Sequence, residues 1–515
     1  MTKGRKWLGA TALGVMLAAG AAAHAADKTI VWGKPAEITG FDVHVAGTVT
    51  DWEMYEMVYE TLLTTDENLK LQPGLATSWE QTSPTSYVFK LRPDAKFSNG
   101  RAVTAEDVAG SLQRIEDPKT VSYWSAQLGT ISKIETPDEH TVKVELKTPH
   151  PAFLAALAHI SAAIIPIKEL KAGTFDPTKD FLGSGPFMAK SHKQDESWSL
   201  VRNPNYWGKN LPVADRLEAP IIPDDSARMA ALRDGRIDFT TFENPDIAHT
   251  LSTIPNISVL PQKTTNYFRI DVNALNAKSP FHDKRVRQAM NLALDRDAIN
   301  NLVFAGTTSV DYPVPAAFGK SACKSTPTYA WPRDKRLEKA KALLKDAGME
   351  HPHVTLLASS TDPVFGMIAQ VAQQSLAEAG FDVQIQQPTM ADYLKKVFTD
   401  GDFDFAISWL AGYTDPSMVI AWWNPNFAVW NKTFQQDVPA LDKTLDEIKA
   451  MQDGPERDAK LDEACKLIDD GANLVALVSK VDYVAYRSDR VKVKIAPRTG
   501  SSNTFQYIAD FAPLH

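Results

Sequence analysis

Long apolar runs are absent from this 515-residue chain after its first 25 residues. No later stretch reaches the roughly 18 apolar residues that a membrane-spanning helix needs. No Cys lies directly after the N-terminal apolar run, which argues against a lipid-anchored mature end. The sequence therefore predicts a soluble mature protein.

Motifs of the common enzyme classes are also missing. There is no G-x-S-x-G, no H-E-x-x-H and no P-loop. One weak pattern remains: Ser321–Lys324 matches S-x-x-K, and Arg498–Gly500 nearly matches K-T-G, the pair used by serine acyltransferases of the β-lactamase and penicillin-binding type. Their Ser opens a helix, whereas Ser321 lies in a Gly- and Pro-rich coil. We therefore predict no catalytic residue and no enzyme, with an exported serine hydrolase or acyltransferase as a remote alternative.

Groups of metal-ligating residues are sparse as well. His44 has no His or Cys at ligand spacing, and a solvated or hydrogen-bonded His is the favoured interpretation. His351 and His353 precede an expected strand, so a surface turn is favoured over a metal pair. We predict no metal site and no cofactor.

Positive charge is in the minority. Lys and Arg number 55 against 63 Asp and Glu, for a formal net charge of −8. An acidic surface argues against nucleic acid and anionic membranes as partners.

The N-terminus has the pattern of an export signal. Lys3, Arg5 and Lys6 precede the apolar run Trp7–Ala23, and Ala23–Ala25 fits the small-x-small rule for cleavage after Ala25. A membrane anchor is the alternative. We predict a cleavable signal peptide over residues 1–25 and a periplasmic protein, in which Cys323 and Cys465 either pair or remain two buried thiols.

The rest of the chain shows α/β patterning. Residues 72–180 are rich in β-prone stretches with hairpin signals and predict a subdomain inserted into a first lobe. Thr50 with Glu53, and Thr104 with Asp107, have capping-box spacing and predict helix starts. Tyr267–Asn273 begins a second lobe, and alternating helices and strands over residues 335–409 predict a parallel sheet.

One aromatic stretch, Ile407–Trp430, follows the last strand of that run. It is broken at Gly412, Asp415 and Pro416 and contains four of the twelve Trp residues: Trp409, Trp422, Trp423 and Trp430. Ligands of open α/β sheets bind just past the carboxyl ends of strands. The stretch therefore predicts part of a binding crevice, and the alternative is that these Trp side chains lie in the core.

Several stretches in this order resemble the extracytoplasmic solute-binding proteins of family 5, which serve dipeptide, oligopeptide and nickel ABC transporters. They are PGLATSWE, YVFKLRPDAKFSNG, TAEDV, GSGPF, LVRNPNYWG, DKRVRQAMNLALDRDAI and the W-x₅-DP segment Trp409–Pro416. The resemblance covers essentially the whole mature chain. It implies a monomeric binding protein that captures a small molecule or short peptide and delivers it to an inner-membrane ABC permease with a cytoplasmic ATPase.

The resemblance also implies an architecture. We expect a two-lobed clamshell of the type II periplasmic-binding-protein fold with an additional β-rich subdomain. Lobe I would span residues 26–261, lobe II 262–480, and a tail over 481–515 would return to lobe I. The hinge strands would lie near Gln262–Asn266 and Ser479–Asp482.

The family's binding residues carry over only in part. The ligand-contacting loop of dipeptide-binding relatives corresponds to Val45–Thr48, which makes Gly47 and Thr48 candidate contacts. Peptide-binding relatives carry an Asp three residues after the Trp, where it pairs with the peptide amine, but this chain has Gly412 there. Asp415 matches a later acidic residue before Pro and is expected to shape the loop.

The predicted binding residues are Gly47, Thr48, Arg269, Trp409, Gly412, Tyr413, Asp415, Trp422, Trp423 and Trp430. Arg269 either pairs with a ligand carboxylate or forms a structural salt bridge. A buried ammonium without a counter-charge is costly, so Gly412 leaves two ligand classes open. The first is a peptide or peptide-like solute, and the second is an opine, glycoside or metal chelate.

Overall fold

The computed structural model describes residues 1, 28–128, 131–324, 326–424, 433–436, 438–500 and 502–514. The predicted signal peptide, apart from Met1, lies outside the described residues, and so does Trp430. Across the described helices, none is long and apolar enough to cross a membrane.

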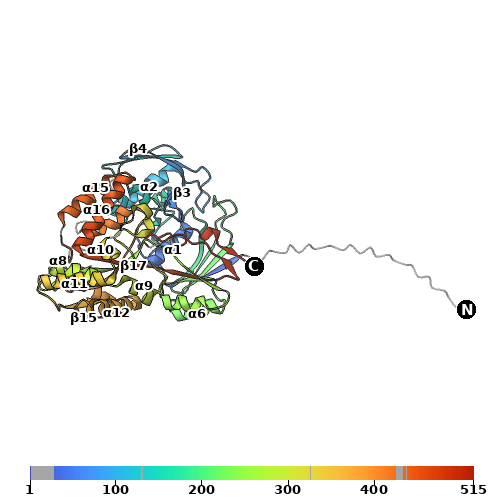
Figure 1. The fold of residues 1–515 in the computed structure, drawn as a ribbon. Coiled ribbons are helices and arrows are strands. Elements are labelled where there is room, and N and C mark those ends of the chain that lie inside the picture. Colours follow the sequence, from blue (N-terminus) through green and yellow to red (C-terminus); the bar gives the residue numbers. More distant parts are fainter. Residues whose placement is uncertain are drawn as a thin grey trace.

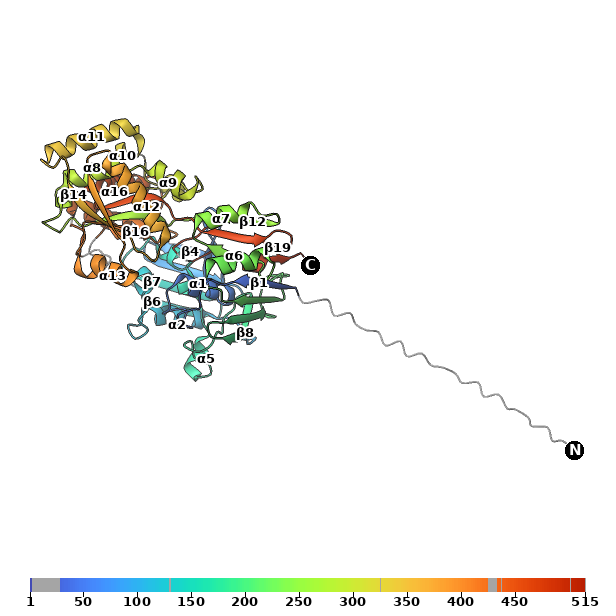
Figure 2. The ribbon, with the colours of Figure 1, turned by 90° about the horizontal axis from the view of Figure 1, so that it is seen from below.

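Two bodies are separated clearly in Figure 2, and we call them the first and second lobes. The first lobe is built on a seven-stranded sheet with the order β12-β18-β11-β1-β10-β9-β8. Its strands are β1 (Thr29–Gly33), β8 (Phe187–Lys193), β9 (Ser197–Arg202), β10 (Arg216–Pro220), β11 (Phe239–Phe242), β12 (Ile257–Pro261) and β18 (Tyr483–Arg487). Its helices are α1 (Val49–Val58), α6 (Asp225–Arg233) and α7 (Pro245–Ser252).

The inserted subdomain carries a four-stranded antiparallel sheet with the order β4-β5-β7-β6. Strand β4 and helix α2 of this subdomain lie at the top of the molecule in Figure 1. Its elements, with the small β2–β3 hairpin that precedes it, are β2 (Leu63–Thr65), β3 (Leu71–Pro73), β4 (Ala76–Ser83), β5 (Ser86–Leu91), α2 (Ala105–Glu116), α3 (Ser125–Leu128), β6 (Ile131–Asp138), β7 (Thr141–Leu146), α4 (Phe153–Ala156) and α5 (Ile167–Ala172).

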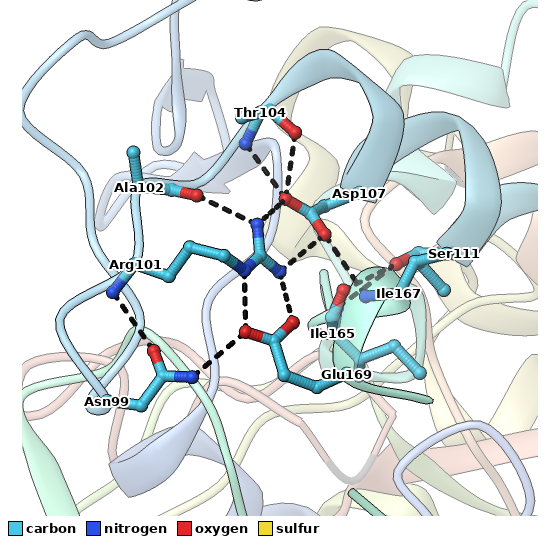
Figure 3. A network of polar contacts seen from close by, with 9 residues as sticks. All are labelled: Asn99, Arg101, Ala102, Thr104, Asp107, Ser111, Ile165, Ile167 and Glu169. Atoms are coloured by element: carbon cyan, nitrogen blue, oxygen red, sulfur yellow. Dashed lines mark hydrogen bonds and ion pairs between the residues drawn. The ribbon is translucent and has the colours of Figure 1, made fainter. Parts of the chain in front are cut away.

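Helix α2 begins as the sequence predicts. Thr104 is its N-cap, and the backbone N–H and hydroxyl of Thr104 both donate to Asp107. Figure 3 shows that Asp107 also accepts from the guanidinium of Arg101, which binds Glu169 of α5 through two further hydrogen bonds of 2.7 Å. One Arg therefore joins the cap of α2 to the helix packed beside it.

The predicted N-cap of helix α1 was wrong by two residues. Its N-cap is Thr48, whose hydroxyl and backbone N–H donate to Asp51 at 2.6 and 2.9 Å. Thr48 and Asp51 have the same i, i+3 spacing as Thr50 and Glu53, so spacing alone does not choose between the two pairs. Glu53 therefore takes no part in the cap of α1.

The second lobe is built on a five-stranded sheet with the order β15-β14-β16-β13-β17. Its strands are β13 (Tyr267–Val272), β14 (His353–Leu357), β15 (Asp382–Gln386), β16 (Phe405–Leu410) and β17 (Leu474–Ser479). Its helices are α8 (Lys284–Ala293), α9 (Arg296–Phe304), α10 (Pro327–Ala330), α11 (Arg333–Asp346), α12 (Pro363–Ala377), α13 (Met390–Leu394), α14 (Pro416–Ile420), α15 (Pro439–Ala450) and α16 (Pro455–Gly471).

The predicted parallel sheet is confirmed for β14, β15 and β16, which pair in parallel. Strand β13 runs antiparallel to both β16 and β17, so the sheet as a whole is mixed. All residues of β13 are buried, as expected of a strand inside the sheet with helices over its faces. Those of β17 are buried too, although β17 lies at the edge of the sheet.

Two chain segments join the lobes and lie side by side. The backbone N–H of Gln262 donates to the carbonyl of Asp482, and that of Lys480 donates to the carbonyl of Asn266. Beyond the second crossing, β18 pairs with β11 and β12 of the first lobe, and β19 (Val491–Lys492) pairs with β20 (Ala512–Pro513). The boundaries at residues 261/262 and 480/481 stay predictions.

The two cysteines form a disulfide, with a Cα–Cα distance of 5.8 Å. The pairing joins the loop before α10 to helix α16. Of the two alternatives that the sequence left open, the structure has the paired one.

A candidate binding cleft between the lobes

A cavity of about 470 Å³ lies where the two lobes face each other, and we call it the interlobe cavity. The first lobe contributes α1, the start of α6 and the segment after β11. The second lobe contributes the start of α12 and Met390 of α13, and the crossing region contributes two charged residues. The charged residues that line it are Glu53, Asp225, Arg228, Glu243, Asp362, Asp482 and Arg498.

A second cavity, of about 300 Å³, lies on the second lobe, and we call it the apolar cavity. Aromatic and aliphatic side chains of α12, α13 and β16 form most of its wall. Met390 lines both cavities, so the apolar cavity adjoins the interlobe cavity. A ligand in the cleft would therefore meet charged groups on one side and flat apolar surface on the other.

Charged residues of the crossing segments form ion pairs beside the interlobe cavity. Arg498 pairs with Asp482, and its Nη2 lies 3.8 Å from Oε1 of Glu53. Lys480 lies 3.1 Å from Asp482 and 3.2 Å from Glu243, with its Nζ 5.5 Å from the ring centre of Trp409. Burial alone would raise the pKa of Asp482, but Arg498 and Lys480 outweigh it and lower that pKa.

The pKa values of two other carboxyl groups of this cavity shift in the opposite direction, upward. Burial raises the pKa of Glu53, with Arg498 and Lys34 opposing the rise and Asp482 and Glu243 adding to it. Burial also raises the pKa of Asp362; Glu243 adds to the rise, and Lys480 opposes it. Both carboxylates would therefore gain from an added positive charge nearby.

Three of the predicted residues line the apolar cavity: Arg269, Trp409 and Trp422. Arg269 makes a buried ion pair with Asp271, at 2.7 Å, which favours the structural of its two predicted roles. Its Nη1 nevertheless makes no hydrogen bond with any described residue.

Gly47 and Thr48, the predicted binding residues of the loop before α1, have structural roles. Thr48 caps α1, as described above. Gly47 packs on the ring of Tyr123, where an added Cβ would lie 2.8 Å from Cε1. Neither residue lines the interlobe cavity.

Gly412 and Tyr413 lie against other parts of the molecule. The backbone N–H of Gly412 donates to Asn266 Oδ1 at 2.8 Å, and a Cβ at Gly412 would collide with the carbonyl of Thr265. Tyr413 packs on Trp124 of the inserted subdomain, with ring centres 6.1 Å apart, and burial raises its pKa to about 12. This loop therefore joins the second lobe to the crossing segment and to the subdomain.

Asp415 and Trp423 have structural partners. Asp415 caps α14 and binds Arg457, in agreement with the expectation that it shapes the loop. Trp423 is only 1% exposed, and its indole N–H donates to the carbonyl of Leu474. Trp423 therefore lies in the core, which was the alternative to a place in the binding crevice, while the adjacent Trp422 lines the apolar cavity.

The residues of the enzyme and metal alternatives contact separate elements. Ser321 donates to Asp458 of α16, whereas Arg498 pairs with Asp482 at the crossing. His44 is buried and hydrogen-bonded to the carbonyl of Ala163, as the favoured interpretation has it. A search of the described residues finds no group of three or more His, Cys, Asp or Glu that could hold a metal.

Sequence reasoning missed most of the charged residues of the interlobe cavity. The charged lining comes from six separate segments of the chain, and each charged residue is unremarkable in its own stretch of sequence. The sequence pointed to Arg498 as part of an acyltransferase pattern, to Glu53 as part of a cap and to Asp482 as the end of a hinge segment, and to none of them as a binding residue.

Comparison with known proteins agrees with this architecture. Residues 70–430 match the model of bacterial extracellular solute-binding proteins, family 5 Middle. The chain is 30% identical to the probable D,D-dipeptide-binding periplasmic protein DdpA of Escherichia coli (strain K12), over 89% of this chain and 90% of that protein. It is 28% identical to the periplasmic oligopeptide-binding protein OppA of the same strain, over 88% and 87%.

Solved structures give the same result. The PBP AgaA in complex with agropinic acid, from A.tumefacien R10, is 27% identical with a TM-score of 0.75, over 95% of this chain and 99% of that one. NikA from Brucella suis in complex with Fe(III)-EDTA shares the fold, at 21% identity and a TM-score of 0.81, over 95% and 100%. The fold is thus the two-lobed type II periplasmic-binding-protein fold, and the chain belongs to the bacterial extracellular solute-binding proteins of family 5.

Proposed function

We propose that this protein is the periplasmic substrate-binding component of an ABC importer and that its solute is a short peptide or a peptide-like compound. The observation that carries the proposal is the interlobe cavity, whose charged lining comes from both lobes and from the crossing segments. A solute held there contacts both lobes at once and so favours their closure. DdpA and OppA, relatives named as peptide-binding proteins, support the ligand class.

The proposal includes export and a permease partner. Residues 1–25 act as a cleavable signal peptide, and the mature monomer delivers its solute to an inner-membrane permease driven by a cytoplasmic ATPase. N-terminal sequencing of protein from the periplasmic fraction tests the first part, with residue 26 expected as the first residue. Binding is expected to change no covalent bond of the solute, since the protein acts without catalysis.

The test of the solute class is mass spectrometry of compounds released from protein purified from its native periplasm, followed by calorimetry with the identified compound. Peptides in the released fraction support the proposal. A second candidate is an opine, a glycoside or a metal chelate, which Gly412 leaves open; the AgaA structure with agropinic acid shows a related protein with a ligand other than a peptide. Release of such a compound with no peptide replaces the peptide assignment.

A further inference from the structure

The position at which peptide-binding relatives carry an Asp is closed in this chain. A Cβ at Gly412 would meet the Thr265 carbonyl, so no side chain projects into the cleft from there. Asp415, the neighbouring acid, binds Arg457 and caps α14. An amine in this cleft therefore needs a carboxylate from elsewhere.

Each basic group around the interlobe cavity has a carboxylate or carbonyl partner, although Nε and Nη2 of Arg498 and Nε of Arg228 make no hydrogen bond with a described residue. Arg498 donates to Asp482, and Arg228 donates to Asp225 and to the carbonyls of residues 222 and 223. Lys480 donates to Asp482 and also pairs with Glu243. Lys34, behind α1, donates to the carbonyls of residues 36 and 50.

Two carboxylates remain without a hydrogen bond from any of these bases. Glu53 is 1% exposed, and its Oε2 makes no hydrogen bond with any described residue. Its Oε1 lies 3.8 Å from Arg498, beyond hydrogen-bond distance. A buried carboxylate oxygen without a donor is a rare and costly arrangement, and one beside a cavity calls for an external donor.

Asp362 faces the same cavity from the other lobe. One of its oxygens accepts from the backbone N–H of Val364 at the start of α12, and it makes no ion pair with a described residue. Glu243 interacts electrostatically with both Glu53 and Asp362 and has a side chain 59% exposed. The three acids thus border one space.

We infer that the interlobe cavity binds the cationic amine of the solute between Glu53 of the first lobe and Asp362 of the second. This inference rests on the proposed binding function and deepens it. An ammonium carries three N–H donors, enough to bond to carboxylates on both walls. Because each lobe supplies one acceptor, the amine also links the two lobes in the closed state.

The neighbouring apolar cavity indicates which chemical group of the solute lies beside its amine. It is lined by Phe365, Trp409 and other aromatic and aliphatic side chains, and it adjoins the interlobe cavity at Met390. An aromatic or aliphatic group close to the amine would fill it. The solute class is therefore a primary amine with a nearby apolar group, as in a peptide whose free N-terminus is followed by a hydrophobic residue.

The test uses the mature protein and a matched pair of probes, Ala-Phe-Ala and its N-acetylated form, with affinities measured by calorimetry. We expect the free-amine peptide to bind at least tenfold tighter than the acetylated one. Glu53→Gln and Asp362→Asn are each expected to weaken the free-amine peptide about tenfold and to leave the acetylated peptide unchanged. Glu106→Gln, at an exposed carboxylate of α2, is the control and should bind as the wild type does.

Thermal melting identifies a variant that fails to fold, and the two variants lie in different lobes, so one remains informative. Equal binding of both peptides, or wild-type affinity in both variants, overturns the assignment of the amine site while the importer role stands. Failure of the wild type to bind either peptide, together with release of only non-amine solutes from the periplasmic preparation, overturns both the amine site and the peptide assignment.

Discussion

Arg457 and Asp415 form a two-point ion pair in the second lobe. Nη2 of Arg457 donates to Oδ1 of Asp415 at 2.6 Å, and Nη1 donates to Oδ2 at 3.1 Å. Both side chains are at least nine-tenths buried. The pair joins the start of α14, just after strand β16, to helix α16, and Asp415 lines neither the interlobe cavity nor the apolar cavity.

We predict that Asp415→Asn lowers the free energy of unfolding by about 3 kcal/mol, because removing one partner of a buried pair leaves the other charge uncompensated. Urea unfolding measures the change. The control is Asp453→Asn, which removes the other partner of Arg457 at a side chain 88% exposed, and we expect a change below about 1 kcal/mol. Weaker binding of free-amine peptides in Asp415→Asn, at unchanged stability, would contradict this structural role.

A second prediction concerns Gly412. Gly412→Ala should destabilise the protein by about 1–3 kcal/mol, because its Cβ collides with the Thr265 carbonyl on the crossing segment. The matched control is Gly471→Ala at the end of α16, where the nearest atom to an added Cβ is 3.9 Å away, so the stability should hold. Thermal melts compare the two. Equal melting temperatures for both variants and the wild type would contradict the prediction, because they would show that the crossing segment moves to accommodate the added Cβ at no cost in stability.

Local rules predicted the elements that depend on neighbouring residues. The cap at Thr104 and Asp107 and the parallel strands β14 to β16 follow from short-range pattern and alternation, and both are confirmed. The same rules misplaced the start of α1, since Thr48 with Asp51 offers the same spacing as Thr50 with Glu53. Two capping pairs with the same spacing can be told apart only by how the folded structure packs around them.

The cleft depends on long-range placement, which one sequence does not encode locally. Trp422 and Trp423 are neighbours, yet one lines a cavity and the other donates to Leu474 in the core. Glu53 and Asp362 lie more than 300 positions apart and line one cavity only because the lobes face each other. Residue type and strand position predicted the aromatic wall, whereas the acidic wall needed the folded structure.

The disulfide supplies a third prediction. Cys323 and Cys465 are separated by 142 residues, so the bond removes much conformational freedom from the unfolded chain. We expect the double variant Cys323→Ala/Cys465→Ala to lose about 3 kcal/mol of unfolding free energy. Wild-type protein unfolded with excess dithiothreitol should match the variant, and adding dithiothreitol to the variant should change nothing. Equal stability of the oxidised and reduced wild type would contradict the stabilising role.

The last prediction follows from Glu56, which is buried in α1 and receives the backbone N–H groups of Asn503 and Phe505 from the C-terminal tail. Burial raises the pKa of Glu56 to about 7, although these hydrogen bonds oppose the rise. A carboxyl with a higher pKa in the folded state binds more protons there than in the unfolded state. Its contribution is therefore present in full below about pH 4, the range of an exposed Glu, and is lost as the pH rises toward 7.

The free energy of unfolding of the wild type should accordingly carry a downward contribution between pH 5 and 7 from this group, and Glu60, whose pKa burial also raises to about 7, should add a similar one. Glu56→Gln cannot titrate, so urea unfolding at several pH values should show a smaller decline for this variant, even where its absolute stability is lower. The slope is the informative quantity, because a merely packing role for Glu56 would lower stability equally at every pH. Parallel pH profiles for the wild type and Glu56→Gln would mean that the bonds from Asn503 and Phe505 keep this carboxylate ionised throughout.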